Sequence, residues 1–369
     1  MGVDPIFDPA NWRSVPFHFW SLVFFVLGCM VGSFLNVVIH RLPLGQSVVS
    51  PPSHCPHCKY SIPWYLNVPL ITWLYLQGKC RNCKAPISAR YFLVELLTGI
   101  AFLGCWLAYG KTSAAIALVY SLLIAGFIAA TFIDFEHFII PDEITIGGTF
   151  AGLICSLVVP GLHGRATVSG NMIQSVLGVA VGAGVIYAIL RIGKLLFGRQ
   201  KLELPIDARI IFTETSVHLP DREIPFEELF YRKSDVVVLH ARTLELPDRC
   251  YKDAVVRLSP ERLLINDEKL NPEEVAHMEA VSQEIVLPRE AMGFGDVKFM
   301  AAIGAFLGWQ ATLFSLMISS MIGSVVGVAL IAAGKREWSS RLPYGPYIAA
   351  AAVIWIFGGD RLLALFANR

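Results

Sequence analysis

Residues 114–142 read AAIALVYSLLIAGFIAATFIDFEHFIIPD, and this stretch decides what kind of protein the chain is. Its first part, Ala114–Ile133, carries no charged side chain and has about the 20 apolar residues that an α-helix needs to cross a bilayer core. Asp134 follows directly. Because carboxylates in or beside membrane spans are rare and mark functional sites by default, the stretch predicts a membrane helix that ends at a functional acid.

Similar apolar stretches recur on both sides of this one. The chain of 369 residues is 55% hydrophobic and only 16% charged, whereas a soluble domain is about 25% charged. We expect a polytopic α-helical membrane protein with about eight transmembrane helices, and seven as the alternative because the sixth stretch is short. The face formed by Gly178, Gly182 and Gly184 is predicted to pack closely against another helix. The expected spans are Phe17–Ile39, Tyr91–Tyr109, Ala114–Ile133, Ile144–Val159, Ile173–Phe197, Val297–Leu307, Ala311–Ala333 and Pro346–Phe366.

Most of the charge lies in one segment, residues 198–291, where 32 of 94 positions are charged. Short β-branched runs alternate there with Pro and Asp turns, so we expect a small β-rich soluble insert. Strands are predicted at Arg209–Thr213, Asp235–His240 and Ala254–Leu258, and one helix at Pro272–Val281. The chain then divides into the N-terminus with the first span (1–40), a cysteine loop (41–90), spans two to five (91–197), the insert (198–291) and the last three spans (292–369).

The placement of Lys and Arg predicts how the chain crosses the membrane. Basic residues gather in the loop after the first span and at the ends of the fifth and seventh spans, and such loops face the cytoplasm. The cysteine loop and the insert are therefore expected on the cytoplasmic side, with both chain ends outside. A net charge of +1 argues against a nucleic-acid partner, which favours a basic surface.

Four cysteines lie in the polar loop as two pairs, Cys55-Pro-His-Cys58 and Cys80-Arg-Asn-Cys83, with 21 residues between them. Two such pairs at this spacing predict a single four-cysteine site for a structural Zn²⁺ ion. Four thiolates close the site, so His57 is expected to be a bystander and the metal to have no catalytic role. The alternatives are a redox or disulfide pair, and loop cysteines with no shared role.

Only ten acidic residues lie outside the insert, and two of them border predicted spans at the same membrane face. These are Asp134 and Asp296, the latter within Gly293-Phe-Gly-Asp-Val-Lys298. Two carboxylates near an apolar boundary do not both ionise easily, so one can take a proton from water while the other hydrogen-bonds a carbonyl. The pair predicts an aspartic peptidase, in which Gly293 and Gly295 allow tight turns and the close approach of a substrate strand.

Each acid also has a structural interpretation. Asp296 would serve as the N-cap of the sixth span, and Asp142, which follows Pro141, as the N-cap of the fourth. Glu95 either pairs with Arg90 or Arg41 or faces the active cavity. Two alternatives from other functional classes are a transporter or channel whose acids carry ions, which expects acids at mid-membrane, and a non-catalytic scaffold.

Several segments in the same order resemble the type IV prepilin peptidases, the GxGD-type leader peptidase/N-methyltransferases of bacterial inner membranes. The resemblance covers most of the chain outside the insert. The segments that carry it are Gly32-Ser-Phe-Leu-Asn-Val-Val-Ile-His-Arg41, the two cysteine pairs, Asn67-Val-Pro69, Gly78-Lys-Cys80, Ile87-Ser-Ala-Arg-Tyr91, Val94-Glu-Leu-Leu-Thr-Gly99, Ile133-Asp134, Ile140-Pro-Asp142 and Gly293-Phe-Gly-Asp-Val-Lys298.

The resemblance implies an activity, its residues and its partners. The catalytic pair falls on Asp134 and Asp296, and the substrate is a prepilin or a type II secretion pseudopilin, cut after a glycine at the cytoplasmic membrane face. The new N-terminus is then methylated from S-adenosylmethionine, whose binding residues the sequence does not identify. A leader peptidase without methyltransferase activity is the alternative. Candidates for supporting the substrate or the site are Gly293, Gly295, Lys298, Asp142 and Glu95.

The long insert departs from the family's usual pattern, in which a few tens of residues separate the two aspartates. It is expected either to dock substrate, regulate the enzyme or couple it to the pilus assembly machinery, or to be a tolerated cytoplasmic addition.

Overall fold

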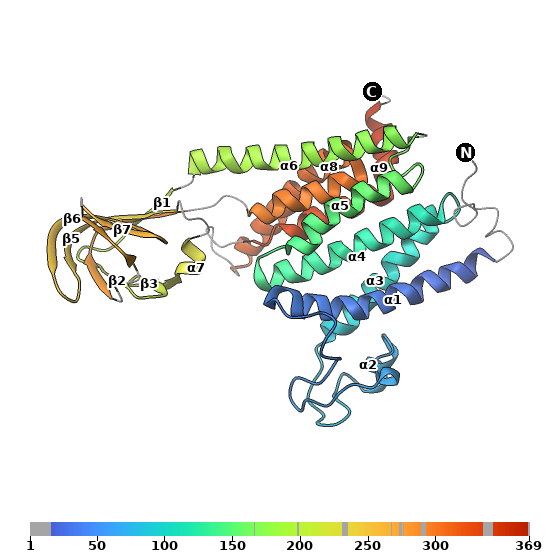
Figure 1. Cartoon of the computed structure of the whole chain (residues 1–369), viewed down its shortest axis with the longest axis horizontal. Coiled ribbons are helices and arrows are strands. Elements are labelled where there is room, and N and C mark those ends of the chain that lie inside the picture. The colour runs from blue at the N-terminus through green and yellow to red at the C-terminus, as the bar shows by residue number, and fades with distance from the viewer. Residues whose placement is uncertain are drawn as a thin grey trace. The chain divides into compact units, whose positions relative to one another are not determined.

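A computed structural model of the chain describes residues 16–165, 167–197, 199–230, 235–266, 268–272, 275, 277–288, 293–334 and 342–367. The chain separates into two compact units, one formed by Met1–Tyr187 and Gly293–Arg369 and the other by Ala188–Met292. The first unit is helical, and its long helices run side by side (Figure 1). The second contains an antiparallel β-sheet.

The long helices are those of a membrane protein. Among the described residues, five helices are long and apolar enough to cross a bilayer: α1, α3, α4, α6 and α8. The helix α5 has 17 residues, and the described apolar part of α9 is likewise shorter. The helices outside the sheet are α1 (Phe17–Arg41), α2 (Ile71–Tyr75), α3 (Ala89–Tyr109), α4 (Ala114–His137), α5 (Asp142–Val158), α6 (Val168–Phe197), α8 (Phe294–Ala332) and α9 (Gly345–Ala367).

The helix α8 consists of two helical segments that meet at Gly308. The backbone there has φ 81° and ψ 174°, which is not helical and which glycine adopts readily. A Cβ placed on Gly182 of α6 would meet both Met300, before the break, and Thr312, after it. Two positions 12 residues apart in a straight helix would be about 18 Å apart, so the chain reverses at Gly308. This agrees with the expected boundary between the sixth and seventh stretches.

The helices α6 and α8 contact each other closely at glycines. The sequence predicts such contacts at Gly178, Gly182 and Gly184, and the first two predictions are confirmed. A Cβ on Gly178 would overlap the carbonyl oxygen of Gly304, and a Cβ on Gly182 would overlap that of Met300. Small residues let helix backbones approach in this way inside a bilayer. The prediction for Gly184 is wrong, because a Cβ there would have no atom within 4 Å and the residue faces away from the contact.

The sheet of the second unit is entirely antiparallel, with the order β4-β3-β2-β9-β5-β6-β7-β8, and β10 pairs with both β1 and β5. The predicted strands at 209–213 and 254–258 are confirmed within β2 and β6, and the third lies largely in β5. The strands are β1 (Arg199–Glu203), β2 (Arg209–Phe212), β3 (Ser216–His218), β4 (Glu223–Pro225), β5 (Val237–Glu245), β6 (Cys250–Ser259), β7 (Arg262–Ile265), β8 (Glu268–Leu270), β9 (Met278–Val281) and β10 (Glu284–Pro288), and one short helix is α7 (Phe226–Leu229).

The predicted helix at Pro272–Val281 is wrong. Met278–Val281 forms β9, which pairs with β2 on one side and β5 on the other. Met278 and Ala280 alternate with less buried positions and enter the core. A central position in the sheet thus outweighs the local helix signal, because both backbone edges of this segment are hydrogen-bonded to neighbours.

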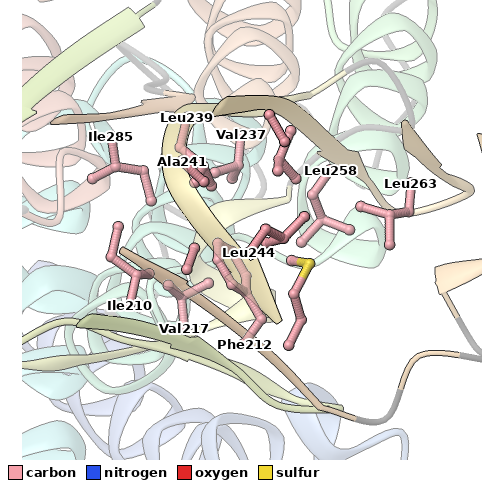
Figure 2. Close-up of a cluster of buried hydrophobic side chains, with 14 of the residues drawn as sticks. Ile210, Phe212, Val217, Val237, Leu239, Ala241, Leu244, Leu258, Leu263 and Ile285 are labelled. Carbon is pink, nitrogen blue, oxygen red and sulfur yellow. The ribbon is translucent and has the colours of Figure 1, made fainter. Parts of the chain in front are cut away.

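Apolar side chains from strands far apart in sequence form one core for this unit, and Figure 2 shows them converging. The labelled members are Ile210, Phe212, Val217, Val237, Leu239, Ala241, Leu244, Leu258, Leu263 and Ile285. Along β5 the buried positions change from odd to even numbers between Ala241 and Leu244. This change occurs where the strand's neighbour switches from β10 to β9.

Candidate active site

Asp134 lies in the last turn of α4 and is only 5% exposed. The helix ends at His137 because Phe138 adopts the left-handed conformation, with φ 55°, and its N–H donates to the carbonyl oxygen of Asp134. A non-glycine residue in this region is uncommon. The chain then turns through Ile140 into α5, so the acid sits at the end of the bundle where α4 and α5 meet.

Asp296 is the third residue of α8 and is 8% exposed. The N-cap of this helix is Gly293, and no side chain caps the helix. The interpretation of Asp296 as the N-cap is therefore wrong: its carboxylate is buried in the bundle. Burial of an acid without a capping role is what a functional carboxylate requires.

The two aspartates lie at the same end of the bundle. The N–H of Gly345, the first residue of α9, donates to Oδ2 of Asp134 at 2.8 Å. Ile140 lies beside Gly345, the neighbour of Asp134, and beside Gly295, the residue before Asp296. A Cβ built on Gly345 would lie 3.0 Å from Cδ1 of Ile140, and a Cβ built on Gly295 would lie 3.6 Å from Cβ of Ile140. Ile140 thus links the residues that adjoin Asp134 and Asp296. Three helices that are distant in sequence thus bring two acids together.

Gly345 is a site residue that the sequence reasoning missed. The only signal was its place in Tyr344-Gly345-Pro346, a turn directly before the last apolar stretch. A Cβ at this position would lie 2.8 Å from Oδ2 of Asp134, so only glycine lets the N–H approach the carboxylate without displacing it.

We expect Gly345→Ala to lower the turnover of the site at least about tenfold while the protein still folds. The added methyl group would push the Asp134 carboxylate out of place, and the rate of a reaction falls steeply when a reacting group is displaced. Steady-state cleavage of a peptide substrate measures this as a fall in kcat with little change in KM. Gly147→Ala in α5 is the control, since a Cβ there would have no atom within 4 Å. Equal losses in the two variants would contradict the role assigned to Gly345.

The structure corrects the reason given for the glycines of the GxGD segment. Gly293 has φ −70° and ψ 147°, which any residue adopts, and Gly295 is not among the glycines with positive φ. Neither is therefore needed for a tight turn. A Cβ on Gly295 would make ordinary van der Waals contact with Ile140, at 3.6 Å from its Cβ.

Asp142 and Lys298 form a second link at this end of the bundle. Asp142 is the first residue of α5 and makes no side-chain cap, since Pro141 is the N-cap, so the capping prediction is wrong. Instead Nζ of Lys298 donates to Oδ1 of Asp142 at 2.6 Å. The pair joins the start of α5 to the start of α8, two residues after Asp296 in sequence. Because partly exposed ion pairs add little to the free energy of unfolding, its main effect is to position the two helix ends.

Glu95 lies in α3 and is only 8% exposed, but it has neither of the arginine partners suggested by the sequence. Its Oε2 accepts the N–H of Leu70 at 2.7 Å. Arg90 pairs with Glu136, and Arg41 donates to the carbonyl oxygen of Ser47. The ion-pair interpretation of Glu95 is therefore wrong.

The four loop cysteines form one cluster in which all thiol sulfur atoms lie within 4.8 Å of one another, so it could hold a metal ion. The sulfur atoms of Cys55 and Cys83 are 3.8 Å apart and those of Cys58 and Cys80 are 4.0 Å apart. A hydrogen bond from the backbone of Tyr60 lowers the pKa of Cys58 to about 6, which favours the thiolate form that metals bind.

Two turns of the same shape present the cysteines. Lys59 N–H donates to the carbonyl oxygen of Cys55, and Lys84 N–H to that of Cys80. Both lysines are left-handed, with φ 58° and 59°. This repeated turn points each cysteine pair toward the other, so the cluster results from local backbone structure as much as from spacing.

Two family models match long parts of the chain. Residues 26–109 match the model of the bacterial peptidase A24 N-terminal domain, and residues 121–202 and 276–328 match that of the type IV leader peptidase family. No solved structure matches the chain.

Three similar proteins are each named prepilin leader peptidase/N-methyltransferase. That of Aeromonas hydrophila is 29% identical over 95% of this chain and 94% of its own length. That of Myxococcus xanthus is 30% identical over 88% and 68%, and that of Pseudomonas aeruginosa is 26% identical over 91% and 90%. The family models match the cysteine loop and most of the long helices but leave residues 203–275, most of the insert, unmatched.

Proposed function

Because the chain belongs to the bacterial type IV leader peptidase family, we propose that it cuts the leader from prepilins or pseudopilins and then methylates the new N-terminus. Asp134 and Asp296 carry the cleavage. The observation behind this is that two of the few acids outside the insert are buried at one end of one helical bundle. A transporter with ion-carrying acids is disfavoured, since both acids stand at helix ends rather than at mid-helix.

The chemistry follows from two carboxyl groups that share one proton. The ionised aspartate takes a proton from water as the water oxygen attacks the carbonyl carbon of the scissile bond. The protonated aspartate gives its proton to the carbonyl oxygen. When the carbon–nitrogen bond breaks, the leaving nitrogen takes a proton from the pair, and the products are a carboxyl group and a free amine. No covalent enzyme intermediate is needed.

Apolar side chains around the acids suit a substrate that is itself apolar. Phe135, Phe138 and Ile139 flank Asp134 in the chain, Phe294 precedes Asp296, and all four are about half exposed. Prepilins present an apolar helix directly after a short basic leader, so such side chains would hold the helix beside the dyad. The exposed apolar surface supports cleavage at the boundary of the bilayer rather than in bulk water.

For the topology we propose eight crossings of the inner membrane. The two segments of α8 count as two crossings because the chain reverses at Gly308. The ion pairs Arg90–Glu136 and Lys298–Asp142 join the starts of α3 and α8 to the α4–α5 turn, so the basic cysteine loop belongs to the same end as the dyad. The excess of basic residues assigns that end to the cytoplasm.

The cysteine cluster is proposed to hold a structural Zn²⁺ ion. With a zinc–sulfur distance of about 2.3 Å, the corners of a tetrahedron of sulfur atoms are about 3.8 Å apart. The sulfur pairs at 3.8 Å and 4.0 Å fit this geometry. Four thiolates leave no open position, so the ion would brace the loop and take no part in the reaction.

The methyltransferase half of the proposal rests on the names of the relatives, and its donor is S-adenosylmethionine. When bound, this donor supplies a methyl group on a positively charged sulfur. The chain's task is then to hold the new amine in its neutral form beside that methyl group. Residues beside the amine would also have to accept the one proton that its nitrogen loses on methylation.

The two activities are tested together with purified protein in detergent and a full-length prepilin. Mass spectrometry should find cleavage with or without S-adenosylmethionine, and one added methyl group on the mature N-terminus only with it. Cleavage that never leads to methylation would favour the peptidase-only alternative. Intact prepilin under all conditions would reject the enzyme and leave the scaffold alternative.

A further inference from the structure

A cavity of about 700 Å³ lies where the end of α1, the start of α3 and the cysteine loop meet. Its volume falls in the range of about 300–1,000 Å³ that is usual for small-molecule sites. The lining combines aromatic rings, cations and one acid, including Tyr60, Trp73, Arg41 and Glu95. It lies within a single unit of the molecule, and the proposed cleavage chemistry uses none of these residues.

The acid in this cavity has no cationic partner. Glu95 accepts a hydrogen bond from the N–H of Leu70, but in the described part of the chain no Lys, Arg or His side chain pairs with it. A buried carboxylate is costly unless it is paired as well as hydrogen-bonded. Glu95 is the one acid in a lining that also carries Arg41, Lys59 and Arg81, and none of these cations pairs with it.

Two more polar atoms in the lining are left without partners. Asn36 is 2% exposed, and its Nδ2 donates to the carbonyl oxygens of Tyr91 and Gly32. Its Oδ1 is buried and has no hydrogen-bond partner among the described residues, and the same holds for Nε1 of Trp73. Buried polar groups are normally satisfied. Asn36 and Trp73 both line the cavity, so its wall contains one unsatisfied acceptor and one unsatisfied donor.

We propose that this cavity binds S-adenosylmethionine, with Glu95 facing its positively charged end. The sulfonium supplies the missing cation, and the adenine carries both an amino donor and ring-nitrogen acceptors for Asn36 and Trp73. Aromatic rings such as Tyr60 and Tyr91 offer faces for stacking. The inference rests on the proposed methyltransferase function and assigns it a site.

The position of the cavity suits a second reaction on the product of the first. Tyr91 and Glu95 lie early in α3, and their neighbour Arg90 pairs with Glu136, two residues after Asp134. The cavity and the dyad are thus at the same end of the bundle. Cys55 and Cys80 also line the cavity, so metal binding would shape the donor site.

The test is equilibrium binding of radiolabelled S-adenosylmethionine to the full-length protein in detergent. Glu95→Gln should weaken binding about 10- to 100-fold, since it removes a charge from a charge-assisted contact. Trp73→Phe, which removes the orphan N–H but keeps an aromatic ring, should weaken it about 3- to 10-fold. Zinc content and gel-filtration profile show whether each variant is folded.

Two controls separate the site from the function. Glu143→Gln removes an exposed acid at the start of α5 and should bind like the wild type. Asp134→Asn should lose cleavage but bind the donor normally. No binding to the wild-type protein would reject the methyltransferase function itself. Normal binding in both Glu95→Gln and Trp73→Phe would retain that function and overturn this site.

Photochemical labelling gives a second readout. Ultraviolet irradiation with the radiolabelled donor should mark a peptide between residues 33 and 95, and unlabelled S-adenosylhomocysteine should prevent the labelling. Protection by a basic leader peptide but not by S-adenosylhomocysteine would assign the cavity to the substrate's leader and overturn the proposal.

Discussion

Replacing either Asp134 or Asp296 by asparagine is expected to lower leader cleavage by about 10²- to 10⁴-fold, because each removes one partner of a shared proton transfer. Asparagine keeps the size of the side chain, and at position 134 it can still accept the N–H of Gly345. The fold should therefore survive. The measurement is the single-turnover rate of prepilin cleavage in detergent.

The double variant tests whether the pair acts as one unit. Groups that act together are strongly non-additive, so Asp134→Asn combined with Asp296→Asn should be no slower than the slower single variant. Glu143→Gln, an exposed acid at the same end of the bundle, should cleave normally. If either single variant processes prepilin at the wild-type rate, the two-aspartate mechanism is wrong.

The second large effect is expected from the cysteine cluster. Cys55→Ser combined with Cys80→Ser should abolish metal binding, because one ligand is lost from each turn. The loop should also lose its fold, because the free energy of binding a structural Zn²⁺ ion is largely folding free energy. The loop between α1 and α3 should then become sensitive to proteases, and processing of full-length prepilin should fall. Elemental analysis should find about one zinc per wild-type chain and none in the variant.

Cys250→Ser is the matched control, since Cys250 is an exposed cysteine in the separate β unit. It should keep the zinc, the protease resistance and the activity. A disulfide between the two turns, detected by mass spectrometry in protein purified under reducing conditions, would instead support the redox alternative. The sulfur separations of 3.8 Å and 4.0 Å are about twice a disulfide bond length.

Local patterns predicted much of the architecture. Apolar stretches of helical length located the long helices, and the reversal at Gly308 lies between the spans predicted at Val297–Leu307 and Ala311–Ala333. The β-branched runs located β2 and β6. The helix predicted at Pro272–Val281 failed, because that segment lies between two strands from elsewhere in the chain, and such partners leave no trace in the segment itself.

The candidate site was predicted unevenly for the same reason. The rarity of acids outside the insert singled out Asp134 and Asp296, and the two cysteine pairs identified their own cluster. The predicted roles of Asp142 as a helix N-cap and of Glu95 as the ion-pair partner of Arg90 or Arg41 were wrong, because both predictions relied on neighbours suggested by the sequence. Their actual partners, Lys298 and Leu70, are 156 and 25 residues away in sequence.

The sequence by itself determined the class of the protein, its membrane helices, its soluble insert and the residue types available for chemistry, because hydrophobicity and residue spacing are properties of short segments. Only the tertiary structure decided which groups meet. Gly345 contacts Asp134 across 211 positions, and Asn36 and Trp73, 37 positions apart, line one cavity. Such contacts depend on how helices pack, and close packing is set by the whole bundle at once.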